Sequence, residues 1–246
     1  AKVETKLLKK EKYDLYAGVI VERLPVITKT LTPIEKEFQD MLNQIEYENS
    51  LKSDFEMRHE KEVKQAELLK SGKVEFDLDS DVSTKQTAQD LKDLYFEEFN
   101  QFKLASRTTE ADRKNDTKSL QRKLEETLIL VVEQKLGDRK ETILPQGKRN
   151  DGETMRQAAE RILRETCGDK MQPVIYGNAP CGFYKYKYPT NKEFDAVGAK
   201  VFYFRSTITS NSKISKEGLQ FHWLTSDELK SKLKDSYFKN IEQFLL

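Results

Sequence analysis

The stretch that most constrains the fold runs from Gly147 to Asp169, with the sequence GKRNDGETMRQAAERILRETCGD. It begins as a polar loop with glycines and continues into an amphipathic run that stops at Gly168. Glycine permits a tight loop, and it is common directly after the last turn of a helix. We therefore expect a glycine loop followed by a helix from Glu153 to Thr166, with one face packed on a sheet.

Short apolar runs elsewhere predict an α/β chain. The helix start Thr32-Pro33-Ile34-Glu35 combines a capping threonine, an N-terminal proline and a returning glutamate. Because neither proline nor glycine follows before Gly72, we expect one helix as far as Lys70. A polar loop is expected over 106–118. Strands are expected within 16–25, 127–132, 141–145, 172–176, 182–188, 196–206 and 221–224, and further helices over 87–104, from 226 and over 236–246.

Composition excludes several classes of protein. The 43 basic and 42 acidic residues leave a net charge of +1, which argues against a polycation that coats nucleic acid but leaves room for local basic patches. The two cysteines, Cys167 and Cys181, form no metal-binding spacing and no disulfide framework. No apolar run reaches the roughly 18 residues of a membrane helix.

Several motifs in the same order resemble the Nudix family. The family pattern is a glycine, five residues, Glu, seven residues, Arg-Glu, an aliphatic residue, any residue, Glu-Glu, any residue and Gly. The segments 144–148 and 221–229 also resemble the loop before this box and the strand-to-helix segment that closes many Nudix domains. The resemblance implies an α/β fold, a mixed β-sheet sandwiched between helices. The positions that match the box are Gly147, Glu153, Arg161, Leu163, Glu165 and Gly168.

Two acids of the box are missing, because Ile162 and Thr166 stand where the family has glutamates. The family's three carboxylates lie at i, i+3 and i+4 and share one helix face. Magnesium prefers several oxygen ligands, so Glu165 alone is a poor site. We predict no catalytic residue, no metal and no cofactor. By resemblance, Arg161 and Glu153 form a structural pair that braces loop and helix.

A long insertion separates the first two expected strands, 17–22 and 127–132. We divide the chain into a flexible segment (1–12), the first strand (13–28), a helical insertion (29–118), and the rest of the Nudix-like domain with C-terminal helices (119–246). The apolar stripe of the insertion's first helix thins after Phe55, which favours a helical hairpin arm over a coiled-coil dimer. Such an arm suits contact with protein or RNA.

The combination of AGVIVERLP (17–25), TPIEKEF (32–38), LPQGK (144–148) and the degenerate box resembles a family of Nudix-like proteins of the mitochondrial large ribosomal subunit. This resemblance implies a non-catalytic structural component of the central protuberance region, in the mitochondrial matrix. Its partners would be ribosomal proteins and RNA of the large subunit, with no membrane and no small-molecule substrate. The start at Ala1 rather than Met fits removal of a transit peptide.

Three groups of cations are candidates for RNA contact. Lys185 and Lys187 alternate with tyrosines on an expected strand, so the lysines share one face and could contact phosphates. The alternative is a half-buried strand with its tyrosines in the core. Lys148, Arg149 and Arg156 form a second group near the glycine loop, and the lysines of 2–12 form a third.

Two other functions stay open. The first is an active Mg-dependent Nudix hydrolase of nucleoside diphosphate derivatives, which would use Glu153, Glu165 and a later acid such as Glu193 or Asp195. The second is a nucleotide-binding sensor that has kept the cleft without the chemistry. His222 beside Trp223 is expected to be packed or half-buried rather than catalytic, and Cys167 is expected to be unreactive because no histidine partner is evident.

Overall fold

The structure, a computed structural model, describes residues 12–72, 86–137, 139–189, 196–208 and 214–245. Its contacts divide the chain into two units, Ala1–Lys29 with Arg107–Leu246, and Thr30–Ser106. The second unit ends earlier than residue 118, where we placed the end of the insertion. Our division into domains stays a prediction. Most of the segment 1–12 lies outside the described residues, and so does most of 71–84, where the acids Asp77, Asp79 and Asp81 predict a linker.

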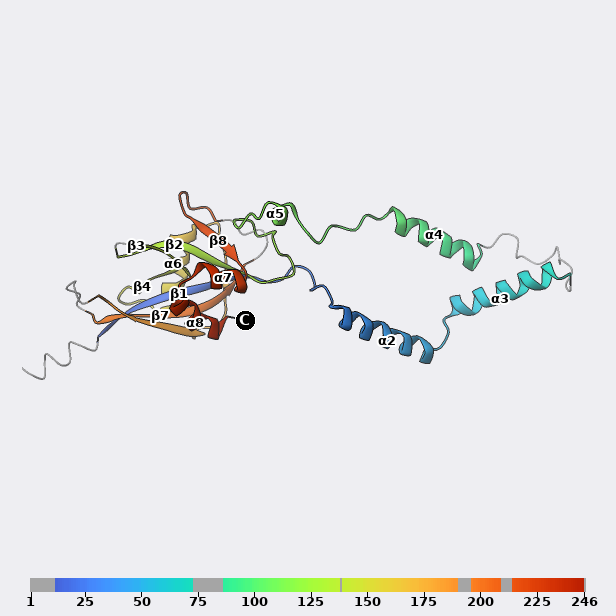
Figure 1. The fold of residues 1–246 in the computed structure, drawn as a ribbon, viewed down its shortest axis with the longest axis horizontal. Helices are drawn as coiled ribbons and strands as arrows, with labels where there is room; N and C mark the ends of the chain where they lie inside the picture. Colours follow the sequence, from blue (N-terminus) through green and yellow to red (C-terminus); the bar gives the residue numbers. More distant parts are fainter. Residues whose placement is uncertain (1–11, 73–85, 138, 190–195, 209–213, 246) are drawn as a thin grey trace, which may run out of the picture. The chain divides into compact units, whose positions relative to one another are not determined.

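The first unit is built on one mixed sheet with the order β3-β2-β1-β7-β5 (Figure 1). In addition, β4 pairs with β1, β6 with β7 and β8 with β2. The pair β1–β7 is parallel and the other pairs are antiparallel. The strands are β1 (Tyr13–Arg23), β2 (Leu128–Leu136), β3 (Arg139–Ile143), β4 (Gln146–Lys148), β5 (Val174–Ile175), β6 (Gly182–Lys187), β7 (Gly198–Thr207) and β8 (Phe221–Leu224).

Strand β1 is the centre of this sheet. It runs beside β7 along its whole length, and near its end it pairs with β2, where Glu22 lies opposite Ile129. Near its start it pairs with β4, where Ala17 lies opposite Gly147. The glycine loop is therefore tied directly to the central strand.

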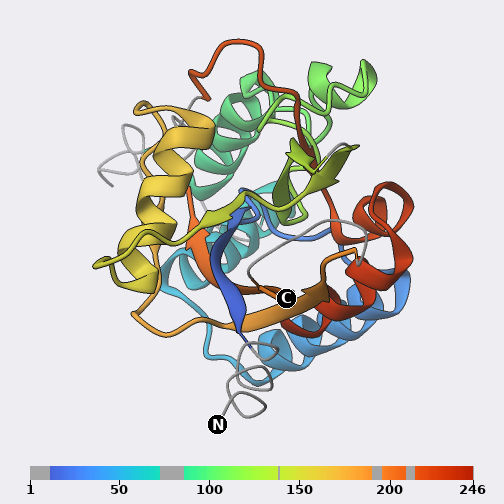
Figure 2. The same cartoon turned by 90° about the vertical axis from the view of Figure 1, so that its left-hand side faces the viewer.

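Helices cover both faces of the sheet, as the Nudix-like fold predicts. Alternate β1 side chains face two cores, with Val19 and Val21 in one and Ile20 in the other. Helix α6 (Met155–Cys167) covers the first core, and α7 (Ser226–Lys232) and α8 (Asp235–Ile241) cover the second. Figure 2 shows α6 in yellow and the C-terminal helices in red on opposite sides of the strands. A short 3-10 helix, Glu242–Phe244, follows α8.

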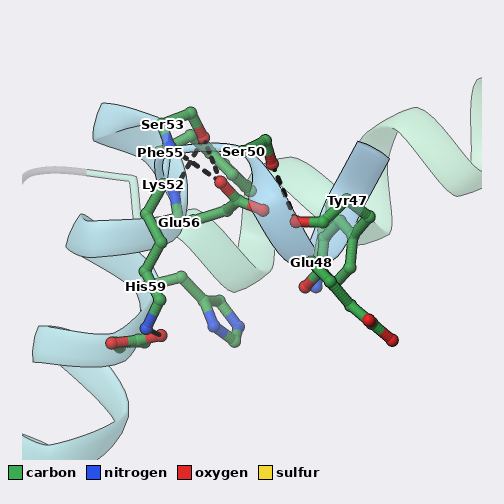
Figure 3. Close-up of a pocket in the computed structure, with 10 residues that line it drawn as sticks. Tyr47, Glu48, Ser50, Lys52, Ser53, Phe55, Glu56 and His59 are labelled. Carbon is green, nitrogen blue, oxygen red and sulfur yellow. Dashed lines mark hydrogen bonds and ion pairs between the residues drawn. The ribbon is translucent and has the colours of Figure 1, made fainter. Parts of the chain in front are cut away.

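The second unit contains α2 (Pro33–Asn49), α3 (Asp54–Lys70) and α4 (Ala88–Gln101). Our prediction of one helix from 32 to 70 is wrong, because the chain leaves the helix at Ser50 and restarts at Ser53. Ser53 accepts a hydrogen bond from the Glu56 amide, and the Glu56 carboxylate accepts one from the Ser53 amide at 2.7 Å (Figure 3). This second capping box interrupts the helix without proline or glycine.

The polar segment 106–118, expected as a loop, contains a short helix, α5 (Glu110–Arg113). Thr109 and Asp112 form its capping box, and Asp112 also accepts a hydrogen bond from the Lys123 amide at 2.7 Å. Thr117 accepts a backbone bond from Trp223 at 2.7 Å. These bonds attach the segment to the first unit, which contains β8.

Candidate functional site

The helix that carries the glycine-loop motif is α6, and its ends are defined by local chemistry. Thr154 is its N-cap, and the side-chain oxygen of Gln157 accepts a hydrogen bond from the Thr154 amide at 2.9 Å. Gly168 ends it with φ of 88°, a conformation that favours glycine. The helix begins two residues later than the expected Glu153, which leaves Glu153 in the loop.

Arg161 joins this loop to the helix. Its guanidinium donates to the two carboxylate oxygens of Glu153 at 2.6 and 3.1 Å and to the carbonyl of Lys148 at 2.9 Å. Glu153 also accepts from the Asn150 amide at 2.6 Å. The hydrogen bonds from Arg161 and Asn150 lower the pKa of Glu153 to about 2. The two residues therefore lie together as the family resemblance implies, and they close the loop onto the helix.

Glu165 is bound by the same arginine. Arg161 Nη1 donates to both oxygens of Glu165 at 3.1 Å, and the Glu165 side chain is 61% exposed. Its backbone carbonyl accepts from Lys216 at 2.5 Å. The one remaining acid of the three-carboxylate set is thus paired with a cation of its own helix.

The positions of the two missing acids are buried. Ile162 is 2% exposed and Thr166 is 7% exposed. Ile162 belongs to the core cluster between α6 and the sheet, and its side chain fills the space beside Gly147, where an added Cβ would lie 2.9 Å from Ile162 Cγ1. An apolar contact occupies the place where ligands would be needed.

These residues do not fit a magnesium ion. A hard divalent cation needs several oxygen ligands that point to one centre. Among the residues that the structure describes, no group of three or more His, Cys, Asp or Glu side chains could hold a metal ion. Glu193 and Asp195, the later acids of the hydrolase alternative, lie outside the described residues.

The cations proposed for RNA contact do not form one cluster. Lys148 makes an ion pair with Asp14 at 3.0 Å, and this bond raises the pKa of Lys148. Arg156 donates to the carbonyl of Gly177 at 3.0 Å, to Asn178 at 2.9 Å and to Glu160 at 3.1 Å. Arg156 is thus occupied by neighbours in the protein.

Lys148 and Lys187 line one cleft of about 980 Å³. Two further cations line this cleft and were not predicted, Lys135 and Arg139, on either side of the β2–β3 turn. Lys135, Arg139 and Lys140, which flank Gly137 in the sequence, were the available signal. Arg149 is half-buried, and its amide donates to the carbonyl of Leu15 at 2.9 Å.

The tyrosines of β6 follow the alternation expected from the sequence, and the alternative reading of them is confirmed. Tyr184 and Tyr186 pack on the core beneath the C-terminal helices, while Lys185 and Lys187 face solvent. Tyr184 meets the ring of Tyr237 edge-on at 5.1 Å. The strand is half-buried, with its tyrosines engaged inside the protein. The ammonium of Lys185 lies 4.5 Å from the ring centre of Tyr13.

Neither Cys167 nor His222 is placed for nucleophilic chemistry. Cys167 is buried, and burial raises the pKa of its thiol to about 12. His222 Nδ1 shares a hydrogen bond with the Thr117 hydroxyl at 2.8 Å, and partial burial lowers its pKa. The half-burial of His222 agrees with the expectation from the sequence, and the unreactivity of Cys167 stays a prediction.

Known proteins resemble both parts of the chain. A family model described as 39S mitochondrial ribosomal protein L46 matches residues 13–112, and one described as NUDIX domain matches residues 120–244. "Large ribosomal subunit protein mL46" of Rattus norvegicus is 39% identical over 95% of this chain and 84% of its own length. That of Bos taurus is also 39% identical, with the same coverage. The chain belongs to the mL46 family.

Membership of the mL46 family confirms the resemblance drawn from the three motifs together with the degenerate box, and the NUDIX match confirms the fold class. Solved structures that resemble the chain include a C. elegans Ap4A hydrolase, 14% identical with a TM-score of 0.38, which covers 49% of this chain and 85% of its own. A NUDIX hydrolase from Nitrosomonas europaea is 21% identical with a TM-score of 0.35, and covers 48% and 79%. None of the helices in the described part of the chain is long and apolar enough to span a membrane.

Proposed function

We propose that this member of the mL46 family is a structural component of the mitochondrial large ribosomal subunit whose Nudix-like domain has no hydrolase activity. The observation that supports the lack of hydrolase activity is the burial of Ile162 and Thr166. Ile162 is part of the packing between α6 and the sheet, and Thr166 is buried on the same helix. The helix retains its structural contacts, and the acids that would hold a metal are absent.

The names of the relatives support the ribosomal part. Proteins 39% identical over nearly the whole chain are named as large ribosomal subunit proteins, so ribosomal proteins are the expected partners and the mitochondrial matrix the expected location. A position in the central protuberance region stays a prediction. RNA contact through Lys148, Arg149, Arg156, Lys185 and Lys187 also stays a proposal, and of these Lys148 and Lys187 share a cleft.

Two measurements test this function. The tagged full chain should co-sediment with mitochondrial large subunits on a sucrose gradient, and a chain found only in the soluble fractions would overturn the ribosomal part. The purified chain should not hydrolyse a panel of nucleoside diphosphate derivatives in the presence of Mg²⁺. Turnover that disappears in Glu165→Gln would establish the hydrolase alternative and overturn the non-catalytic part.

Calorimetry distinguishes the proposed structural role from that of a nucleotide-binding sensor. Titration of the wild-type chain with nucleoside di- and triphosphates should give no binding heat. A saturable heat that is lost when Lys187 is changed to Gln would favour the sensor, since Lys187 lines the cleft. Asp227→Asn, an exposed change on α7, serves as the matched control.

A further inference from the structure

Helix α2 presents an apolar stripe whose side chains are exposed in the described part of the chain. No residue of α2 is buried. Five large apolar side chains repeat at intervals of three and four residues and therefore share one face. Each is between 47% and 76% exposed: Ile34, Phe38, Met41, Leu42 and Ile45.

Carboxylates border this stripe on both sides. Glu37 lies one turn before Met41 on one edge, and Glu46 lies one turn after Leu42 on the other. The single lysine of the helix, Lys36, is two residues from Phe38 and so lies on another face. Five carboxylates against one lysine give α2 a formal charge of −4: Glu35, Glu37, Asp40, Glu46 and Glu48 against Lys36.

Helix α4 repeats this combination of exposed apolar side chains and negative charge. Leu94, Tyr95 and Phe99 are between 42% and 66% exposed. Its four carboxylates against one lysine leave a formal charge of −3: Asp90, Asp93, Glu97 and Glu98 against Lys92. Because both helices are negative, the stripe of α2 is poorly matched to α4 and to a second copy of the chain.

We propose that the α2 stripe binds a basic amphipathic helix of a neighbouring protein. Such a helix would bury its own apolar residues on the stripe, with lysines and arginines beside the glutamates on either edge. The phosphate backbone of RNA is a poor match for this surface. Its negative charge would be repelled by the carboxylates of α2, and it has no apolar groups to bury the stripe. The inference rests on the proposed function in one respect, that the neighbouring protein belongs to the mitochondrial large ribosomal subunit.

Crosslinking within the assembled subunit identifies what covers the stripe. The full chain is produced in cells with a photoreactive amino acid at Met41, or at Asn43, which lies on the opposite side of α2. Large subunits are then isolated and irradiated, and the crosslinked peptides are sequenced. Met41 should crosslink to a protein segment with apolar residues at helical spacing and an excess of lysine and arginine, and Asn43 should not. Crosslinks from Met41 to RNA, to an acidic segment or to the same chain would overturn the proposal.

Charge reversal provides an independent readout. The double variant Glu37→Lys/Glu46→Lys should be recovered with large subunits severalfold less than wild type, and Glu37→Gln/Glu46→Gln should lie between them. Asp40→Lys, away from the stripe, is the matched control and should behave as wild type. Because no residue of α2 is buried, none of these changes alters a core. Recovery of the double lysine variant at or above the wild-type level would contradict a basic partner. Failure of the wild type itself to join large subunits would instead overturn the proposed function.

Discussion

Arg161 holds Glu153 through two hydrogen bonds of 2.6 and 3.1 Å, and with its other amino group it holds Glu165 at 3.1 Å. One guanidinium therefore closes the glycine loop and also neutralises the acid that the family pattern leaves on α6. In this member of the mL46 family Arg161 joins the glycine loop to α6.

Glu153→Gln should destabilise the fold in a pH-dependent way. The pKa of Glu153 is lowered from 4.5 to about 2 in the folded chain, so its stabilising effect is fully present above about 4.5 and is lost as pH falls through about 2. The urea midpoint of the variant should be below that of wild type at pH 7, and the difference should shrink between pH 4.5 and 2. Glu217→Gln, at an exposed position, should show no such convergence. A difference that is constant with pH would contradict the brace.

Gly147→Ala should destabilise the chain by about 1–3 kcal/mol, because the new Cβ would lie 2.9 Å from Ile162 Cγ1. Ile162→Ala alone should cost roughly 2–5 kcal/mol through the cavity it leaves. In the double variant the added methyl occupies part of that cavity, so the combined cost should fall below the sum of the two. Urea unfolding of the wild type, the two single variants and the double variant measures these free energies.

The control for that cycle pairs Gly147→Ala with Ile241→Ala, which lies in the core on the other face of the sheet. These two costs should add within about 0.5 kcal/mol. Additivity of Gly147→Ala with Ile162→Ala as well would show that the two residues are not coupled.

Glu228→Gln should destabilise the chain by roughly 2–4 kcal/mol, because it leaves a buried arginine without its carboxylate. Arg122 donates to both oxygens of Glu228 at 2.6 and 2.9 Å and to the carbonyl of Trp223 at 3.0 Å, and its side chain is only 3% exposed. Glu110→Gln removes an exposed pair with Lys114 and should change the unfolding free energy by less than about 0.5 kcal/mol. Chemical denaturation measures both unfolding free energies. Equal losses in Glu228→Gln and Glu110→Gln would show that the buried pair contributes no more than the exposed one.

Replacing Thr30–Ser106 by a short Gly-Ser linker should leave the first unit folded. The ends of the deleted segment are already held together, since Arg107 donates to the carbonyl of Thr28 and Val26 donates to that of Leu124 at 2.8 Å. The shortened chain should unfold cooperatively with a midpoint near that of the full chain, as followed by circular dichroism. It should no longer co-sediment with large subunits, and co-sedimentation at the wild-type level would show that the helices are not needed for assembly.

The sequence by itself determined most of the fold and the absence of two acids of the Nudix box, at Ile162 and Thr166. The glycine loop, the alternation in β6 and the caps at Thr32 and Gly168 are local signals, because each depends on a few neighbouring residues. The break between α2 and α3 was also local, and Ser53 with Glu56 was readable in the sequence. It was missed because only proline and glycine were counted as helix breakers.

Only the tertiary structure decided what the remaining polar groups do. Arg122 and Glu228 are 106 residues apart, and nothing in the sequence near either residue indicates the other. The same holds for Gly147 and Ile162, whose contact depends on how α6 packs on β4. Side-chain partners across the sheet follow from packing in three dimensions, which local periodicity does not encode. The sequence thus showed that two acids were missing, and the structure showed that the core had closed over their places.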